Sequence, residues 1–200
     1  MKTRLRLRPR EPNRIASVHG LLRSWDFPQE AHAKTFAISE AGNINFAGVV
    51  AGSYAHIFTP GEPEFEAAIE PGVRPLVLAA VCEGGLVTYT SCQGHGYADS
   101  ELNSECHIGI LPRTRRELHR AWTAFKRVTL HDGDSLQVSS LAIYPWHLFD
   151  EHSQREVPVV DLYLHCRTTV DFNGYLEQLS LDARLVAGTL RAEFSRRRGL

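Results

Sequence analysis

The 200-residue sequence contains no long hydrophobic run, and no segment approaches the roughly 20 consecutive apolar residues that a membrane-spanning helix needs. No apolar stretch follows the basic start of the chain, so a secretory signal is not predicted. The sequence also has no excess of positive or negative charge. The 22 basic and 23 acidic residues argue against wholesale coating of nucleic acid, although they leave room for a local basic patch. These absences predict a cytoplasmic protein with no membrane partner.

Paired cysteines and paired metal-binding motifs are also absent. The sequence has neither a Cys-x-x-Cys pair nor a His-Glu-x-x-His helix. Four widely spaced cysteines are present: Cys82, Cys92, Cys106 and Cys166. In a reducing cytoplasm we expect them to be free thiols or metal ligands rather than disulfides. Lysine is rare beside arginine, and a GC-rich bacterial genome explains this bias as easily as phosphate recognition does.

With 43% hydrophobic residues, a chain of this length suits one globular domain. We predict a basic arm over residues 1–12 and a single domain over residues 13–200. The apolar spacing predicts helices at about 13–25, 63–70, 71–83, 114–128 and from 172 onward, weak strands between 34 and 60, and strands at 86–92, 106–111, 136–144 and 157–167. Helices and strands do not alternate singly from residue 73 onward. This order predicts an α+β fold with a mainly antiparallel sheet and helices packed on one face.

The segment from Thr88 to Gly96 has the residues best suited to chemistry. The strand at 86–92 ends in Cys92, and Gly94 and Gly96 predict a turn directly after it. A thiol at Cys92 and an imidazole at His95 suit either one bound metal ion or a nucleophile–base pair. The alternative without chemistry is a buried cysteine followed by a turn with a solvent-facing histidine.

Alternation along the strands indicates a second group of polar side chains. In the strand at 157–167 the polar face consists of Asp161, Tyr163, His165 and Arg167, and the other face is apolar. His107 shares this side if the strand at 106–111 also buries its aliphatic residues. Carboxylate, phenol, imidazole and guanidinium groups can all act in acid–base or anion chemistry, so this row predicts a wall that faces a ligand. The alternative is an ordinary solvated sheet face.

The favoured functional hypothesis is a zinc enzyme. It performs hydrolytic or related polar chemistry on a small or nucleotide-like substrate. Cys92, His95 and His107 would hold Zn²⁺, and the fourth position would be left to water or substrate. The predicted catalytic groups are Cys92, Asp161, Tyr163 and His165, and the predicted substrate-binding residues are Ser91, Gln93, Gly94 and Arg167.

Two other hypotheses remain open. In a metal-free transferase or hydrolase, Cys92 would be the nucleophile, a nearby histidine the base, and Gln93 with the amides around Gly94 an oxyanion pocket. In a non-catalytic module, Arg167 and the glycine segment would hold an anion. Nucleic acid is a possible but not favoured partner. It would use the basic arm and a helix cluster whose charges a solvated helix face also explains: Arg113, Arg115, Arg116 and Arg120.

The segment Tyr89-Thr90-Ser91-Cys92-Gln93-Gly94-His95, preceded by a helix and a strand, resembles Thr-Ser-Ser-Cys-Ser-Gly-Arg of the wybutosine-synthesising methyltransferases, which act third in tRNA guanosine modification. It is also similar to a Ser-Cys-x-Gly-His signature in small uncharacterised bacterial and phage proteins. The resemblance implies a methyl donor and a tRNA substrate. It carries over Ser91, Cys92 and Gly94 as residues of the pocket.

Overall fold

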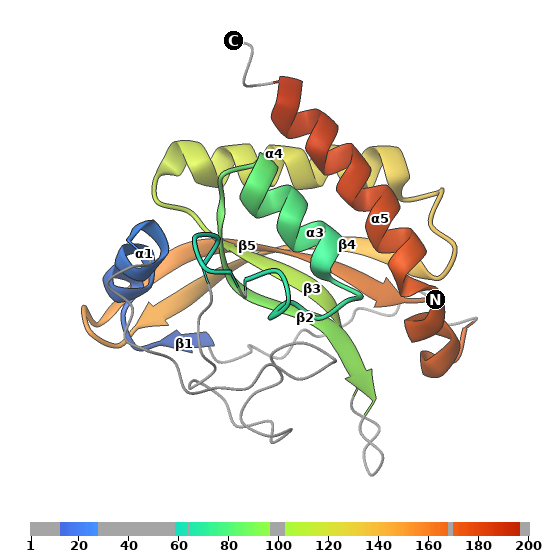
Figure 1. The fold of residues 1–200 in the computed structure, drawn as a ribbon, viewed down its shortest axis with the longest axis horizontal. Coiled ribbons are helices and arrows are strands. Elements are labelled where there is room, and N and C mark those ends of the chain that lie inside the picture. Colours follow the sequence, from blue (N-terminus) through green and yellow to red (C-terminus); the bar gives the residue numbers. More distant parts are fainter. Residues whose placement is uncertain (1–12, 28–58, 64, 97–102, 168–169, 197–200) are drawn as a thin grey trace, which may run out of the picture.

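A computed structural model describes residues 13–27, 59–63, 65–96, 103–167 and 170–196 (Figure 1). Within them, five strands form one sheet in the order β1-β4-β5-β3-β2. The strands are β1 (Asn13–Ile15), β2 (Val87–Gly96), β3 (Asn103–Leu111), β4 (Ser139–Asp150) and β5 (Arg155–Cys166). β1 is parallel to β4, and the other neighbours are antiparallel. The predicted basic arm lies outside the described residues, and so does the segment of weak strands expected between 34 and 60, except for residues 59 and 60.

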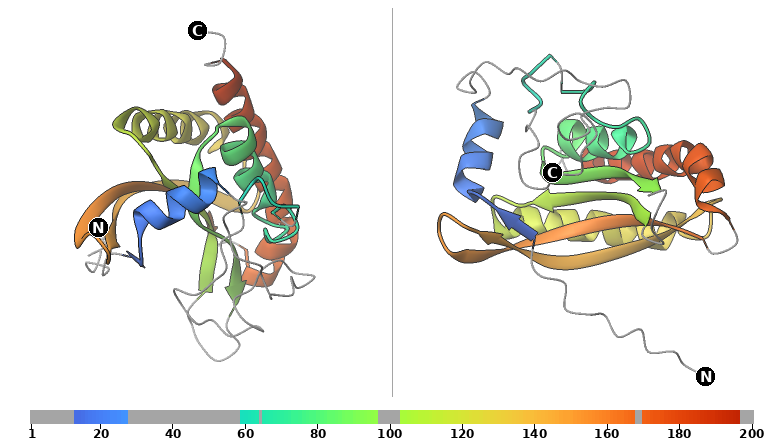
Figure 2. Two further views of the ribbon diagram at one scale, coloured as in Figure 1. Left: turned by 60° about the vertical axis from the view of Figure 1, so that its left-hand side comes forward. Right: turned by 90° about the horizontal axis from the view of Figure 1, so that it is seen from below.

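The helices are α1 (Val18–Asp26), α3 (Arg74–Leu78), the π-helix η2 (Ala79–Glu83), α4 (Arg115–Asp132) and α5 (Phe172–Arg196). α3, α4 and α5 lie on one face of the sheet, and α1 lies beside β1 at one end (Figures 1 and 2). The predicted α+β fold is therefore confirmed. No described helix is both long and apolar enough to cross a bilayer.

The hydrophobic core fills the space between the sheet and these helices. β3 and β5 contribute Ile108, Ile110, Leu162 and Leu164, and the helices contribute Phe125, Leu179, Val186 and Leu190. All of these side chains are at most 1% exposed. Burying each such side chain contributes about 1.5–3 kcal/mol. Tyr175 of α5 also donates its hydroxyl proton to the carbonyl oxygen of Leu164 at 2.6 Å, which fixes α5 over β5.

The N-terminal elements differ from the sequence prediction. Residues 13–15 form β1 instead of opening a helix, because they pair with β4. The helix begins at Val18, where the Ser17 hydroxyl accepts a hydrogen bond from the amide of Gly20 at 3.0 Å. The helix predicted at 63–70 is also wrong, since the described residues there form turns. The helix predicted from Pro71 begins at Arg74 and continues as η2.

The start of α4 has one of the two hydrogen bonds of a capping box. Thr114 is the N-cap, and its hydroxyl accepts from the amide of Glu117 at 3.1 Å. The Glu117 carboxylate accepts from the amide of Arg113 at 2.8 Å, one residue before the cap. A helix therefore starts where the sequence predicts it.

The turn predicted at Gly94–Gly96 is wrong. β2 continues through both glycines, because Gly94 pairs with Glu105 and Gly96 with Asn103 on β3. Gly94 has φ 98°, a conformation that favours glycine, so the strand absorbs this distortion without ending. A register shift between Thr88 and Thr90 marks a bulge earlier in the same strand. Pairing along β3 thus overrides the local glycine signal.

Candidate functional site

The sheet face opposite α3, α4 and α5 carries a row of rings. His107 of β3 and Tyr163 of β5 are direct cross-strand partners, and their rings stack with centroids 4.8 Å apart. Tyr163 stacks in turn on His165 at 5.4 Å. Tyr144 of β4 meets Tyr163 edge-on at 5.3 Å and stacks on Trp146 at 5.5 Å. We call these five half-buried residues the ring platform.

Cross-strand pairing shows which residues of β3 and β5 share the face of the ring platform. His107 pairs with Tyr163, and Gly109 pairs with Asp161, so the polar rows of β3 and β5 point to the same side. The expected common face of His107, Asp161, Tyr163 and His165 is therefore present.

Glu105 connects the two histidines of the platform. Its carboxylate oxygen Oε1 accepts from the amide of Cys166 at 2.9 Å, and Oε2 is hydrogen-bonded to Nδ1 of His165. The Tyr144 hydroxyl lies 3.0 Å from the other ring nitrogen of His165, Nε2. The backbone carbonyl of Glu105 lies 3.0 Å from Nδ1 of His107.

The tautomer of His107 follows from its partners. A carbonyl oxygen only accepts, so Nδ1 of His107 carries the proton that it donates to Glu105. Nε2 of the neutral ring then carries a lone pair, and it lies 3.4 Å from the hydroxyl of Thr90. His107 therefore presents an acceptor nitrogen on the side nearest β2.

Asp161 lies on the same face of the sheet as the platform and is 1% exposed. Tyr89 donates its hydroxyl proton to Asp161 Oδ1 at 2.8 Å. Gly109 makes this contact possible, because a Cβ atom there would lie 2.5 Å from Tyr89, 2.6 Å from Thr90 and 2.7 Å from Asp161 Oδ1. The bulge in β2 falls at the same place, so it positions the Tyr89 side chain over a strand that has no side chain at residue 109.

Cys92 belongs to this face of the sheet. It pairs directly with His107 and is half-buried, and its sulfur accepts from the amide of Gly94 at 3.3 Å. Cys106 is a different kind of thiol, since it is fully buried on the helix side. Burial raises its pKa well above 9.0, and negative charge at Cys92 and Glu70 raises it further. Cys106 therefore stays a protonated core residue.

Two predicted substrate-binding residues of β2 do not join the platform. Ser91 pairs with Ile108 and so lies on the other face. Gln93 accepts from the amide of Gly72 at 2.9 Å through Oε1, and its own amide donates to Glu70 at 2.7 Å. These bonds fix the segment before α3 to the edge of the sheet.

Arg167 also differs from its predicted role. It follows the last residue of β5, and its guanidinium donates to the carbonyl oxygens of Ser139 at 2.7 Å and Gly133 at 3.2 Å. The side chain thus fixes the start of β4 and the end of α4, instead of extending the polar row.

The predicted zinc ligands are only partly described. Cys92 and His107 are cross-strand partners, but the side chain of His95 lies outside the described part of the chain. Among the side chains that are described, no group of three or more His, Cys, Asp or Glu residues is placed to hold a metal ion. Zinc at Cys92, His95 and His107 therefore stays a prediction.

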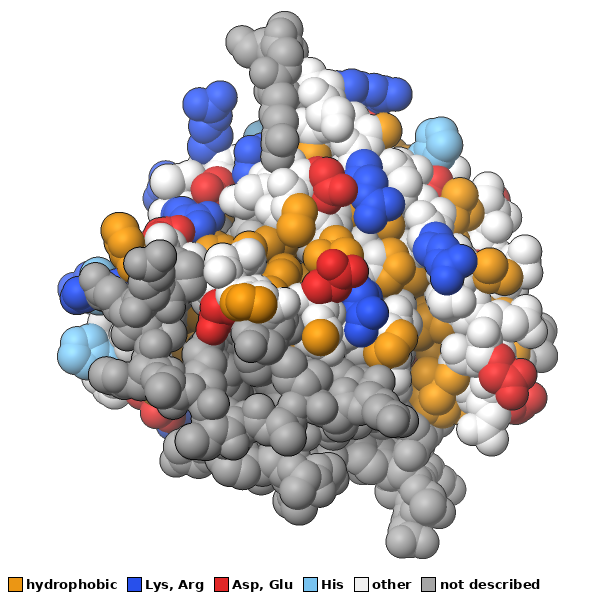
Figure 3. Space-filling view, viewed as in Figure 1, with side chains coloured by type: hydrophobic (Ala, Val, Ile, Leu, Met, Phe, Trp, Pro, Cys, Tyr) orange, Lys and Arg blue, Asp and Glu red, His pale blue; other side chains and the backbone are white. Residues whose placement is uncertain are grey.

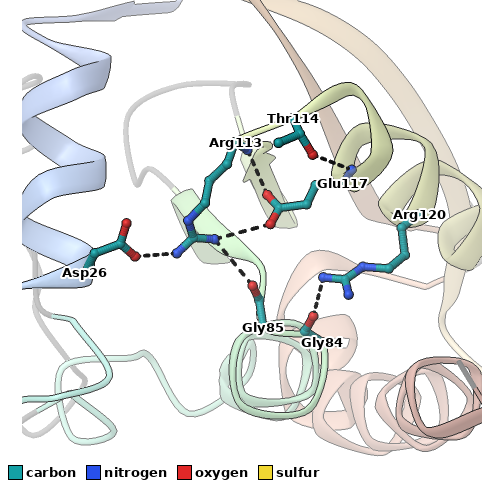
Figure 4. Close-up of polar contacts among 7 residues, drawn as sticks. All are labelled: Asp26, Gly84, Gly85, Arg113, Thr114, Glu117 and Arg120. Atoms are coloured by element: carbon teal, nitrogen blue, oxygen red, sulfur yellow. Dashed lines mark hydrogen bonds and ion pairs between the residues drawn. The ribbon is translucent and has the colours of Figure 1, made fainter. Parts of the chain in front are cut away.

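The arginine cluster considered for nucleic-acid binding is partly structural, as Figure 4 shows. Arg113 bonds to Asp26 of α1 at 2.7 Å and to the carbonyl oxygen of Gly85, and Arg120 donates to the carbonyl oxygen of Gly84. These contacts join α1, the end of η2 and α4. On the side seen in Figure 3, Lys and Arg side chains are interspersed with Asp and Glu. The described helix surface therefore offers no continuous basic patch in this view.

No family model, curated protein or solved structure matches this chain. The resemblance carried by Tyr89–His95 stays a prediction, so the function has to be argued from the site itself.

Four residues of the site are missing from the sequence prediction: Tyr89, Glu105, Tyr144 and Trp146. Alternation along β4 places Tyr144 and Trp146 on one face, and this signal is present in the sequence. The β4–β5 register, which sets Tyr144 opposite Asp161, has no comparable signal. The register decides which rings meet.

A cleft of about 570 Å³ lies between α4 and α5, in the helix layer. Its basic residues Arg127 and Arg196 both bond to Glu193, which is 5% exposed. The single carboxylate offsets only one of these two charges, but none of the site residues predicted from the sequence lines this cleft, so the ring platform is the better candidate site.

Proposed function

We propose that the protein binds a planar, nucleotide-like ligand at the ring platform. The observation that supports this is the offset stack of three rings, His107, Tyr163 and His165, across two neighbouring strands. A planar heterocycle can extend such a stack, and stacking on an aromatic side chain contributes about 1–3 kcal/mol per base. The rings are half-buried, so part of their surface is available for contact.

We infer an enzyme rather than a passive binding protein. Cys92, Asp161 and His165 lie on the same face as the rings, and thiol, carboxylate and imidazole are the groups that proton transfer and nucleophilic catalysis use. A cytoplasmic location is part of the proposal, since all four cysteines are free thiols.

Titration with AMP tests the platform. Ligand binding is followed by tryptophan fluorescence, since one of the three tryptophans, Trp146, stacks on Tyr144 of the platform. Tyr163→Leu removes the central ring of the stack, and we expect its Kd for AMP to rise about 5- to 100-fold. Tyr163→Phe is the matched control, because it keeps the ring and loses only the hydroxyl. We expect its Kd to stay within about twofold of the unmodified protein.

Ribose 5-phosphate serves as a ligand control because it lacks the base. Weak or absent binding of this compound, together with the Tyr163→Leu loss, supports stacking. Equal binding of AMP by Tyr163→Leu and the unmodified protein, with unchanged thermal unfolding, would show that the ligand is held elsewhere.

Zinc-dependent hydrolysis is a second candidate. The tautomer of His107 favours it, because a lone pair on Nε2 with Nδ1–H bonded to a carbonyl is the arrangement of many metal-binding histidines. Zinc held by Cys92, His95 and His107 would activate a bound water. Protein purified without chelator should then contain about one zinc per chain, lost in Cys92→Ser and His107→Gln. A zinc content unchanged in both variants would exclude these ligands.

A further inference from the structure

Glu105, His165 and Tyr144 form a continuous chain of hydrogen bonds that ends on the ring platform. We propose that this chain is a proton relay in which Tyr144 removes a proton from a substrate stacked beside His165. This inference rests on the proposed ligand-binding role of the platform. Tyr144 is then the catalytic residue, and His165 and Glu105 are positioning residues that act through it.

The first member of the relay is the Glu105 carboxylate, whose position is fixed by hydrogen bonds. Oε1 of Glu105 accepts from the amide of Cys166, which can only donate, and Oε2 faces Nδ1 of His165. Both oxygens of the carboxylate are therefore engaged as acceptors. Glu105 lies on β3 next to Cys106, whose partner on β5 is Leu164, so sheet pairing itself brings Glu105 and His165 together.

The second member of the relay is His165, and its tautomer sets the direction of the hydrogen bonds on either side of it. A carboxylate at Nδ1 favours the tautomer with the proton on that nitrogen, and this leaves the lone pair on Nε2. The Tyr144 oxygen lies 3.0 Å from Nε2, so the phenol donates and the imidazole accepts. The side chains of Glu105 and His165 are each 28% exposed. This partial shielding from water strengthens the charge-assisted bond between them.

The third step is the transfer itself. An N–H or O–H bond of the stacked heterocycle breaks, and its proton passes to the Tyr144 oxygen. The original Tyr144 proton passes to Nε2 of His165 at the same time. The electron pair of the broken bond stays on the substrate, which becomes an anion. The imidazolium that forms is stabilised by Glu105, and reversal of these transfers returns the proton to the product.

The geometry of Tyr144 suits this role. Its ring is nearly perpendicular to both Tyr163 (85°) and His165 (80°), so it borders the stack instead of continuing it. A substrate ring that extends the stack beside His165 then meets Tyr144 at its rim. Proton donors of a heterocycle lie in its plane, at the same rim.

Nitrogen-15 NMR of histidine-labelled protein tests the relay without any variant. We expect His165 to show a protonated Nδ1 and an acceptor Nε2. Protonation of Nε2 in the neutral ring would overturn the proposal, because Tyr144 could not pass its proton to it.

Glu105→Gln is the informative variant. The carboxamide oxygen still accepts from Cys166, but its NH₂ group donates to Nδ1 and forces the proton onto Nε2. An aryl sulfonyl fluoride, located by mass spectrometry, reports the reactivity of the phenol. In the unmodified protein Tyr144 should be labelled at least about tenfold faster than Tyr163, and Glu105→Gln should remove this preference. Tyr144→Phe confirms the labelled position.

Measuring AMP binding in the same variant shows whether a negative result refutes the proposed relay or the proposed ligand-binding role of the platform. We expect Glu105→Gln to bind AMP within about twofold of the unmodified protein while losing Tyr144 labelling. Equal labelling of Tyr144 in both proteins would refute the relay even if AMP binds. If AMP does not bind but the tautomer and the labelling are as expected, the ligand class is wrong and the relay stands. Should Glu105→Gln not fold, the tautomer in the unmodified protein decides.

Discussion

At the scale of single residues, the site depends on Gly109 because glycine has no side chain. A Cβ atom there would lie 2.5 Å from the Tyr89 ring and 2.7 Å from the Asp161 carboxylate. Gly109→Ala therefore has to separate these two groups, and the surrounding strands leave little room to do so. We expect a loss of about 1–3 kcal/mol in the free energy of unfolding, measured by urea denaturation.

Gly188→Ala is the matched control for this prediction. Gly188 lies inside α5, and a Cβ atom there would meet nothing within 4 Å. Because alanine favours helix more than glycine does, we expect this change to stabilise the protein by up to about 1 kcal/mol. Equal effects of the two substitutions would show that the crowding at Gly109 has no energetic consequence.

At the scale of elements, Asp182 joins α5 to β4. Its carboxylate accepts from the amides of Gln137 at 2.9 Å, Val138 at 3.0 Å and Ser139 at 2.8 Å, and the residue is 2% exposed. Asp182→Ala leaves three amides at the start of β4 without this acceptor. We expect a loss of about 3 kcal/mol in the free energy of unfolding by urea denaturation.

Glu177 provides the comparison on the same helix, since it is an exposed carboxylate of α5. Glu177→Ala should change the free energy of unfolding by no more than about 0.5 kcal/mol. A loss for Asp182→Ala no larger than this would mean that water replaces the carboxylate at the three amides.

The element scale also shows what the sequence can and cannot predict. Alternation depends only on position along a strand, so it correctly places Tyr163 and His165 on one face. The β4–β5 register places Tyr144 in the site, and the bulge in β2 places Tyr89 there. Both features depend on which strands pair, and a sequence does not show this directly. Gly94 shows the same limit, because a glycine that favours a turn locally is held in a strand by its partner Glu105.

At the scale of the whole molecule, the order of elements along the chain was enough to predict the α+β layers. The far edge of the sheet was not predictable. β1 has only three residues, too few to show the apolar–polar alternation of a strand. Its place is set by pairing with β4 and by the amide of Glu151, which donates to the carbonyl oxygen of Ile15 at 2.9 Å. Such long-range contacts attach β1 and α1 to the rest of the fold.

Asp150 makes this attachment sensitive to pH. Burial acts to raise the pKa of Asp150, but hydrogen bonds from Ser153, His152 and Val18 outweigh it and hold the pKa below 3.8. A lowered pKa in the folded state gives stability that is present above the ordinary carboxyl pKa and is lost as the pH falls through the folded value. Urea denaturation should therefore find Asp150→Asn less stable than the unmodified protein at about pH 7, with a difference that shrinks towards about pH 2.5. Glu156→Gln, an exposed change from carboxylate to amide in the same hairpin, is the control for the substitution itself. A constant difference for Asp150→Asn across this range would mean that its effect does not arise from the charge.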